Sequence, residues 1–192
     1  MNRTDYRLAL TSSLVALLLV LGYAEPAPAQ HDHGAAAGVS PHAGMQAREI
    51  KALSDTLIRQ YRSGEGMGLA LAAELNHYPG PRHVLELADS LALSAAQRRA
   101  VTAARETVSA EARRLGERII AAERELDQAF TGGALSEARL RELVAAIAAL
   151  QGELRFTHLR AHLEARAALT PDQVRRYDQL RGYGAAEQHH HD

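Results

Sequence analysis

The sequence predicts an all-α fold built on a long antiparallel helical hairpin with short flanking helices. Three observations lead to this class. Apolar residues between the two ends of the chain recur with the period of an α-helix, and no segment alternates as a half-buried strand does. Two long periodic stretches are joined by a short link, which favours antiparallel packing. Aromatic residues make up only 4% of the chain and tryptophan is absent, which is typical of hairpins held together by aliphatic side chains.

The first 29 residues have the pattern of an export signal. Arg3 and Arg7 give a positive start, residues 8–21 are mostly apolar, and Ala-Pro-Ala at 27–29 supplies the small residues of a cleavage site. An uncleaved membrane anchor is less favoured, because the apolar run is shorter than the ~20 residues that a spanning helix needs. We therefore expect a periplasmic protein exported by a signal peptide, residues 1–29, that is then removed.

Two tails that contain histidine flank the predicted helical domain, residues 46–183. Residues 30–45 are rich in Gly, Ala, Ser and Pro without an apolar period, so they predict a flexible tail. Residues 184–192 predict a second one, which is either a natural end or a purification tag. We expect the tail histidines to gather metal ions weakly, without a defined site. These residues are His31, His33, His42, His189, His190 and His191.

The composition argues against several classes of protein. The chain has no cysteine, so it forms no disulfide and any metal site must use His, Met and carboxylates. A net charge of −1 gives no reason to expect nucleic-acid binding. The sequence has no G-x-S-x-G motif, no phosphate-binding loop and no H-E-x-x-H motif. We therefore expect a protein that is not an enzyme and that holds no organic cofactor.

The helices predicted before the hairpin are short. Residues 46–62 predict the first, because apolar residues recur on one face, and residues 69–76 predict the second after a glycine-rich interruption. The sequence Tyr-Pro-Gly-Pro at 78–81 is a firm break, and its last proline suits the first turn of a third short helix over 82–90.

Two similar helix-start signals define the rest of the chain. Leu-Ser-Ala-Ala-Gln at 93–97 opens a helix that runs to about residue 130, and Leu-Thr-Pro-Asp-Gln at 169–173 opens a short last helix. In each motif the hydroxyl caps the helix and the glutamine three residues later closes a capping box. Between them, Ser136 caps a second long helix that continues to about residue 168. The motif residues are Leu93, Ser94, Gln97, Leu169, Thr170 and Gln173.

These two motifs, with a helical hairpin between them, look like the paired LTxxQ motifs of the Spy/CpxP family. The resemblance covers about residues 80–183. It implies an all-helical periplasmic protein, usually a homodimer shaped like a curved cradle. Members of the family include chaperones that work without ATP, an inhibitor of a stress-sensing kinase, and a heavy-metal branch of sensors and zinc-responsive chaperones.

The chain resembles the heavy-metal branch more closely, because it carries histidines both in its helices and at its ends. It departs from the nickel/cobalt sensor of that branch, since it lacks an N-terminal H-x3-H pair. The ligand positions of that relative therefore do not carry over to this sequence.

His158 and His162 are the most specific candidates for metal ligands. Side chains four residues apart share one helix face, roughly 5–6 Å apart at Cβ, so two imidazoles can bind one Zn²⁺, Ni²⁺, Co²⁺ or Cu²⁺ ion. His158 falls within the apolar stripe of its helix, so the pair should face a partner helix. Zinc normally takes four ligands. His83 is the best further candidate, then His77, and Glu86 offers oxygen.

Other interpretations of the pair stay open. His158 could pack at a helix or dimer interface, satisfied by a carboxylate, with His162 exposed, or the pair could act as a proton switch near pH 6. Three functions follow from these interpretations. The first is a metal-binding stress protein, the second an ATP-independent chaperone that holds unfolded periplasmic proteins, and the third a regulatory subunit that docks on a membrane-bound stress sensor.

Overall fold

The computed structural model describes residues 38–184. The predicted signal peptide, and the histidines of both tails apart from His42, lie outside this range. The fold described below is that of the compact unit that begins at Ser40. Residues 38–184 form six α-helices and no strand. Within that range, no helix combines the length and the apolar character needed to cross a membrane.

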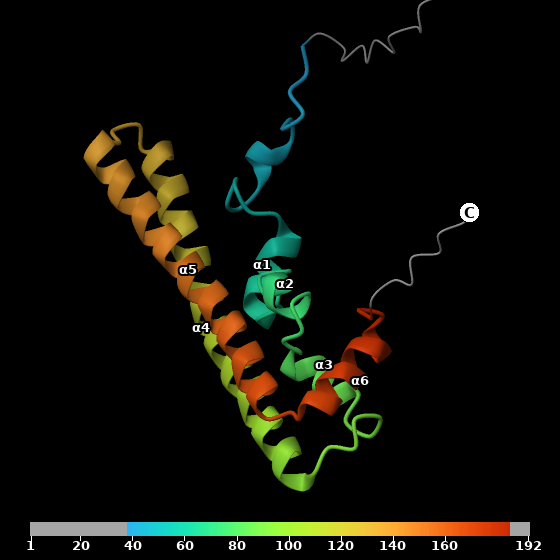
Figure 1. The fold of residues 1–192 in the computed structure, drawn as a ribbon. Coiled ribbons are helices and arrows are strands. Elements are labelled where there is room, and N and C mark those ends of the chain that lie inside the picture. The colour runs from blue at the N-terminus through green and yellow to red at the C-terminus, as the bar shows by residue number, and fades with distance from the viewer. Residues whose placement is uncertain (1–37, 185–192) are drawn as a thin grey trace, which may run out of the picture. The chain divides into compact units, whose positions relative to one another are not determined.

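The centre of the fold is the predicted hairpin, formed by α4 (Ala95–Thr131) and α5 (Glu137–Ala167), which run antiparallel along each other (Figure 1). Ser94 caps α4, since its hydroxyl accepts from the backbone N–H of Gln97 at 3.2 Å. The Gln97 side chain accepts in return from the N–H of Ser94 at 3.0 Å, which completes the capping box. The all-α class and the hairpin are therefore confirmed.

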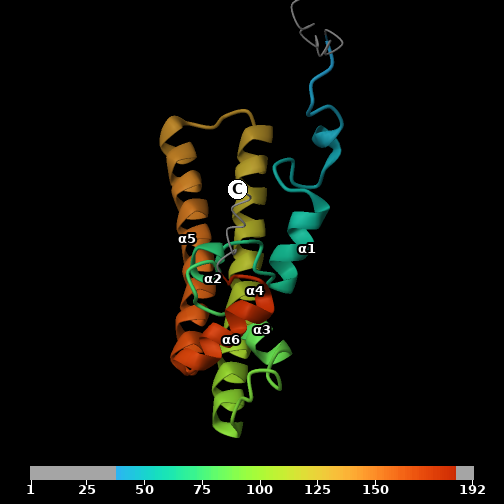
Figure 2. The same ribbon diagram turned by 45° about the vertical axis from the view of Figure 1, so that its right-hand side comes forward.

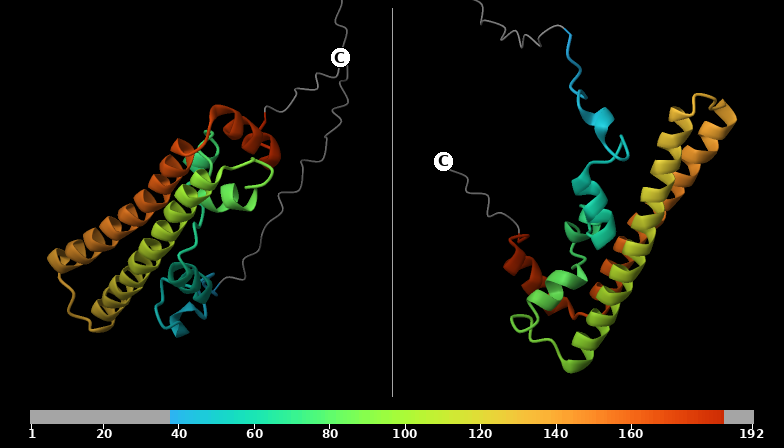
Figure 3. Two further views of the ribbon diagram at one scale, coloured as in Figure 1. Left: turned by 90° about the horizontal axis from the view of Figure 1, so that it is seen from below. Right: turned by 180° about the vertical axis from the view of Figure 1, so that it is seen from behind.

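Four short helices lie on one side of the hairpin (Figures 2 and 3). They are α1 (Asp55–Ser63), α2 (Leu71–Glu74), α3 (Pro81–Glu86) and α6 (Pro171–Arg181). Helix α1 packs on α4, α2 on α5, and α3 on both long helices. Helix α6 begins with the second predicted capping box, formed by Thr170 and Gln173. The short helices therefore build a layer against one face of the hairpin.

The first predicted helix, residues 46–62, is wrong at its start. Only a single 3₁₀ turn, Met45–Ala47, forms there, and the α-helix begins at Asp55. The hydroxyl of Ser54 accepts from the N–H of Leu57 at 3.2 Å, which fixes that start. Ile50 is still fully buried, because the irregular segment before the cap packs against the hairpin. Helices α2 and α3 are also shorter than the predicted spans of 69–76 and 82–90.

The interior consists of two apolar clusters that lie at different positions along the length of the hairpin. The α1 core joins α1 and the segment before it to the middle of α4. The α3–α6 core joins α3 and α6 to the start of α4. The α1 core consists of Ile50, Leu53, Ile58, Tyr61, Ala112, Leu115, Ile119, Ile120 and Leu154. The α3–α6 core consists of Val84, Ala88, Leu91, Leu93, Val101, Leu169, Val174 and Tyr177.

Candidate metal site

A cavity of about 430 Å³ lies between the two cores. Its walls come from the end of α1, from α3, and from the facing stretches of α4 and α5. On α5, Leu154 belongs to the α1 core and Leu169, just beyond the helix, to the α3–α6 core, and His158 and His162 lie between them. His83 of α3 lines the same cavity. The structure therefore brings three of the four predicted histidines to one pocket.

His158 is the most deeply placed of the three. Its side chain is 9% exposed, and its Nε2 atom is buried without a hydrogen-bond partner. Burial lowers the pKa of its imidazole, and the nearby His162 ring lowers it further. The ring is therefore neutral at pH 7, which is the form that binds metal ions. Among residues 38–184, no carboxylate forms a hydrogen bond or ion pair with the His158 ring, and a carboxylate from a second subunit stays a prediction.

His162 is held by the chain segment before α3. Its Nδ1 atom lies 2.7 Å from the backbone carbonyl oxygen of Tyr78. A carbonyl can only accept, so Nδ1 carries a proton and donates it, and Nε2 is the ring nitrogen left for other contacts. The ring packs directly on Gly80, where a Cβ atom would come within 2.9 Å of Cε1 and 3.1 Å of Nε2. The absence of a side chain at Gly80 therefore allows the ring to take this position.

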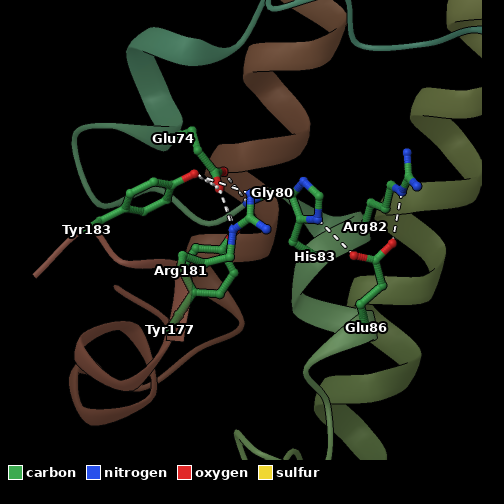
Figure 4. A network of polar contacts seen from close by, with 8 residues as sticks. All are labelled: Glu74, Gly80, Arg82, His83, Glu86, Tyr177, Arg181 and Tyr183. Carbon is green, nitrogen blue, oxygen red and sulfur yellow. Dashed lines mark hydrogen bonds and ion pairs between the residues drawn. The ribbon is translucent and has the colours of Figure 1, made fainter. Parts of the chain in front are cut away.

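His83 also has its Nδ1 atom engaged. The Nδ1–H donates to Glu86 Oε2 at 2.8 Å, and Glu86 Oε1 accepts from Arg82 Nε at 2.9 Å (Figure 4). These two bonds, that of His83 first, lower the pKa of the Glu86 carboxyl. Glu86, predicted as a possible oxygen ligand, is thus occupied in fixing His83, and Nε2 is the ring nitrogen left for other contacts.

His77 lies apart from the other three histidines. Its Nδ1 atom is 2.8 Å from Asp178 Oδ2 on α6, and it does not line the pocket. Its φ of 65° places it in the left-handed region, at the turn where the chain leaves α2. Its predicted role as a ligand stays a prediction.

Among residues 38–184, no three His, Asp or Glu side chains are close enough together to hold a metal ion as they stand. The pocket nevertheless fits such an ion in its donor chemistry. His83 and His162 each use Nδ1 as a donor, His158 Nε2 has no partner, and all three rings border the same cavity. A set of imidazole nitrogens suits Zn²⁺, Cu²⁺ and Ni²⁺. Shifts of these side chains within the pocket would be needed to close the site.

Sequence reasoning missed Glu74, the last residue of α2, which is only 7% exposed. Its Oε1 atom accepts from the buried hydroxyl of Tyr177 at 2.5 Å and from that of Tyr183 at 3.3 Å (Figure 4). Arg181 Nε lies 3.7 Å from the same oxygen. Burial, and then the hydrogen bond to Glu74, raise the pKa of the Tyr177 hydroxyl, so it stays a proton donor. Glu74 therefore fastens α2 to α6 and the residues after it.

The second carboxylate oxygen of Glu74 faces the pocket side. Oε2 accepts from the backbone N–H of Gly80 at 3.1 Å and lies 3.6 Å from His162 Nδ1. No signal in the sequence marks Glu74, since it stands in the apolar stretch Leu-Ala-Leu-Ala-Ala-Glu-Leu and its tyrosine partners lie about a hundred residues away.

The predicted motif residues all lie at the base of the hairpin. Leu93 and Leu169 are buried in the α3–α6 core, and Ser94 and Thr170 cap their helices as predicted. The two motifs also meet in space, because the side-chain amides of Gln97 and Gln173 bond to each other. They do not contribute to the pocket, so their role here is in the fold.

These features define an all-helical protein with a pocket of histidines between a long hairpin and a layer of short helices. A sequence model of the family described as heavy-metal resistance matches residues 66–176, more than half of the chain. The chain belongs to this family, which is part of the Spy/CpxP-like group of helical, typically periplasmic proteins. This confirms the resemblance inferred from the two motifs. No curated protein matches the chain, and no solved structure does.

Proposed function

We propose that this protein is a periplasmic metal-binding stress protein that binds one divalent transition-metal ion through His158, His162 and His83. The observation that carries the proposal is the convergence of these three imidazoles, from two helices, on one cavity between the apolar cores. Membership of a heavy-metal resistance family also supports a role in metal binding. We also propose that the protein is exported by a signal peptide that is then cleaved. The mature protein recovered from the periplasm should therefore begin at Gln30.

His83 is the ligand that must adjust to complete the site. Its side chain is partly exposed on the six-residue helix α3, and its bond to Glu86 spans less than one turn. Turning the ring away from Glu86 is therefore a local change. His158 and His162 lie within the long helix α5, more than a turn from its end, so they supply the rigid half of the site. Water, Glu86 or a second subunit of a homodimer completes the coordination.

The proposal is tested by Zn²⁺ binding in a variant that retains only four histidines. In this four-histidine variant every other histidine is replaced by asparagine, and His77, His83, His158 and His162 remain. The replaced residues are His31, His33, His42, His189, His190 and His191. Calorimetric titration should give sub-micromolar binding at a fixed ratio of metal to protein.

Replacing both His158 and His162 by alanine in that variant should remove the binding. The matched control is Gln151→Ala/Arg155→Ala, an exposed pair on the same helix with the same spacing, which should leave the affinity unchanged. The function is wrong if the histidine pair can be removed without loss of affinity. Repeating the titration with Ni²⁺, Co²⁺ and Cu²⁺ ranks the metals.

The chaperone function is the second candidate, and a separate surface favours it. Phe156 and Leu163 of α5 are 54% and 55% exposed, and the guanidinium of Arg160 lies over the Phe156 ring at 5.9 Å. Exposed apolar side chains next to a positive charge suit an unfolded chain that is apolar and acidic. Suppression of the aggregation of an unfolded client, without ATP and without metal, would support this function, and Phe156→Ser/Leu163→Ser should abolish it.

A further inference from the structure

The segment from Glu74 to Gly80 connects the histidine pocket to α6. Its start is bound to α6, because Glu74 Oε1 accepts from the Tyr177 hydroxyl at 2.5 Å. Its end is bound to the pocket, because the Tyr78 carbonyl oxygen lies 2.7 Å from His162 Nδ1. Glu74 Oε2 accepts from the Gly80 N–H at 3.1 Å, which closes the segment into a compact turn. The position of the His162 ring is thus tied to α6 through a short series of direct contacts.

Glu74 also acts on His162 directly. Its Oε2 atom lies 3.6 Å from Nδ1, the ring nitrogen that donates to Tyr78. Both side chains are largely buried, at 9% and 13% exposure, so solvent screens their attraction weakly. Carboxylate and carbonyl partners on the far nitrogen of a metal-ligating histidine fix its orientation and make its other nitrogen a better ligand. Glu74 and the Tyr78 carbonyl occupy these two partner positions here.

We infer that Glu74 is a positioning residue for the metal site and that it couples metal binding to the docking of α6. This inference rests on the proposed function, because it requires a metal ion at His162. A ring that ligates a metal through Nε2 carries more positive charge, so its Nδ1–H is drawn more strongly to Tyr78 and Glu74. The carboxylate held there is the same one that receives the hydroxyl of Tyr177. Metal binding should therefore favour the docked position of α6, and an undocked α6 should weaken metal binding by the same factor.

The docking of α6 covers apolar residues at the base of the hairpin. Tyr177 is fully buried in the α3–α6 core, and the start of α6 pairs with the start of α4 through Gln173 and Gln97. Release of α6 from Glu74 would expose part of that core at the base of the hairpin. The metal ion would act as the effector that decides how much of this apolar surface is available.

Tyr177→Phe in the four-histidine variant tests the coupling. This change removes the hydroxyl that Glu74 receives, keeps the buried ring, and lies outside the pocket lining. The Zn²⁺ affinity should fall about 10-fold, the lower end of what the loss of an outer partner costs a metal site. Tyr61→Phe is the matched control, because it deletes the hydroxyl of another buried tyrosine that does not contact Glu74, and it should leave the affinity unchanged. Glu74→Gln should weaken Zn²⁺ binding at least as much as Tyr177→Phe.

Hydrogen exchange of the backbone amides of α6 tests the coupling without any substitution in the core. It is measured in the protein with all pocket residues unchanged. Zn²⁺ should slow exchange in α6 (Pro171–Arg181) but not at the far end of the hairpin, and Glu74→Gln should remove this effect. The coupling is overturned if Zn²⁺ binds through His158 and His162 but α6 exchange is unchanged and Tyr177→Phe binds as tightly as its control. If instead the histidine pair itself proves dispensable, both the proposed function and the coupling fall.

Discussion

The side-chain amides of Gln97 and Gln173 donate to each other, with Nε2 of Gln97 2.7 Å from Oε1 of Gln173 and the reverse pair at 3.2 Å. Each Oε1 also accepts from the N–H of its own helix cap, as the capping boxes require. The second hydrogen of each amide goes to a backbone carbonyl, that of Ala168 for Gln97 and that of Leu91 for Gln173. Both amides are therefore saturated, and the starts of α4 and α6 are joined.

This pairing predicts that either glutamine stabilises the fold through the other. Gln97→Ala leaves the partner amide and a backbone carbonyl without partners in a half-buried place, so it should cost about 1–3 kcal/mol of unfolding free energy. Gln173→Ala should cost about the same, and the double variant should cost clearly less than the sum. Urea unfolding followed by circular dichroism measures all three. Gln179→Ala, on the exposed side of α6, is the control and should change little; strict additivity of the two losses would show that the amides act independently.

Two glycines inside the long helices should respond in opposite ways to alanine. A Cβ at Gly116 of α4 would lie 2.2 Å from the backbone oxygen of Tyr61, so α1 would have to move away from α4. A Cβ at Gly152 of α5 meets nothing within 4 Å. Gly152→Ala should therefore raise the unfolding free energy by roughly 0.5–1 kcal/mol, the gain in helix propensity, whereas Gly116→Ala should lower it by about 1–3 kcal/mol. Thermal unfolding of the two variants gives the comparison, and shifts of Tm in the same direction would contradict the close contact.

The sequence was sufficient for the hairpin because its signals are local. Capping boxes and apolar periodicity act within a few residues, and both long helices begin where Ser94 and Ser136 predict. The first helix was misjudged because burial alone mimics helical periodicity. Ile50 and Leu53 are core residues, but the backbone that carries them is irregular up to the cap at Ser54.

The candidate site could be predicted only in part. His158 and His162 share one helix face, so their proximity follows from spacing, and the proline break before His83 correctly predicted the start of a third short helix. What holds these rings is set by tertiary contacts. The carboxylate of Glu74 and the carbonyl of Tyr78 reach His162 across 88 and 84 positions of sequence, which no local pattern records.

Burial of His158 should make stability depend on pH. The pKa of its imidazole is lowered in the folded state, whereas in an unfolded chain it is about 6.5. Below that value the unfolded state takes up the proton first, so stability should fall as the pH drops from about 7 through the lowered folded pKa. Urea midpoints from pH 8 to pH 5, in zinc-free buffer, measure this. His83, His162 and Glu86 border the same pocket, so the comparison must isolate His158.

Replacing His158 by glutamine makes that comparison. This variant should lose less stability on acidification than the parent protein, because the group that takes up the proton on unfolding is gone. His42→Gln, at an exposed turn, is the control and should keep the full pH dependence of the parent. An unchanged slope in His158→Gln would mean that other groups cause the loss.

Gly80 offers the most selective way to disturb the pocket without removing a ligand. A Cβ at this position would stand 2.9 Å from Cε1 and 3.1 Å from Nε2 of His162, so the ring must shift by a few tenths of an ångström or turn. Gly80→Ala should therefore weaken Zn²⁺ binding in the four-histidine variant by about 10-fold, comparable to losing an outer partner of a metal ligand. The backbone of Gly80 is extended, with φ of −78°, so alanine brings no strain of its own.

The matched control for this prediction is Gly66→Ala. Gly66 also lines the pocket, but a Cβ there meets nothing within 4 Å, so the affinity should stay that of the parent. Calorimetric titration of both variants, with thermal unfolding to confirm that each is folded, gives the result. Equal affinities for Gly80→Ala and Gly66→Ala would mean that the observed place of the His162 ring is not the one from which it binds metal.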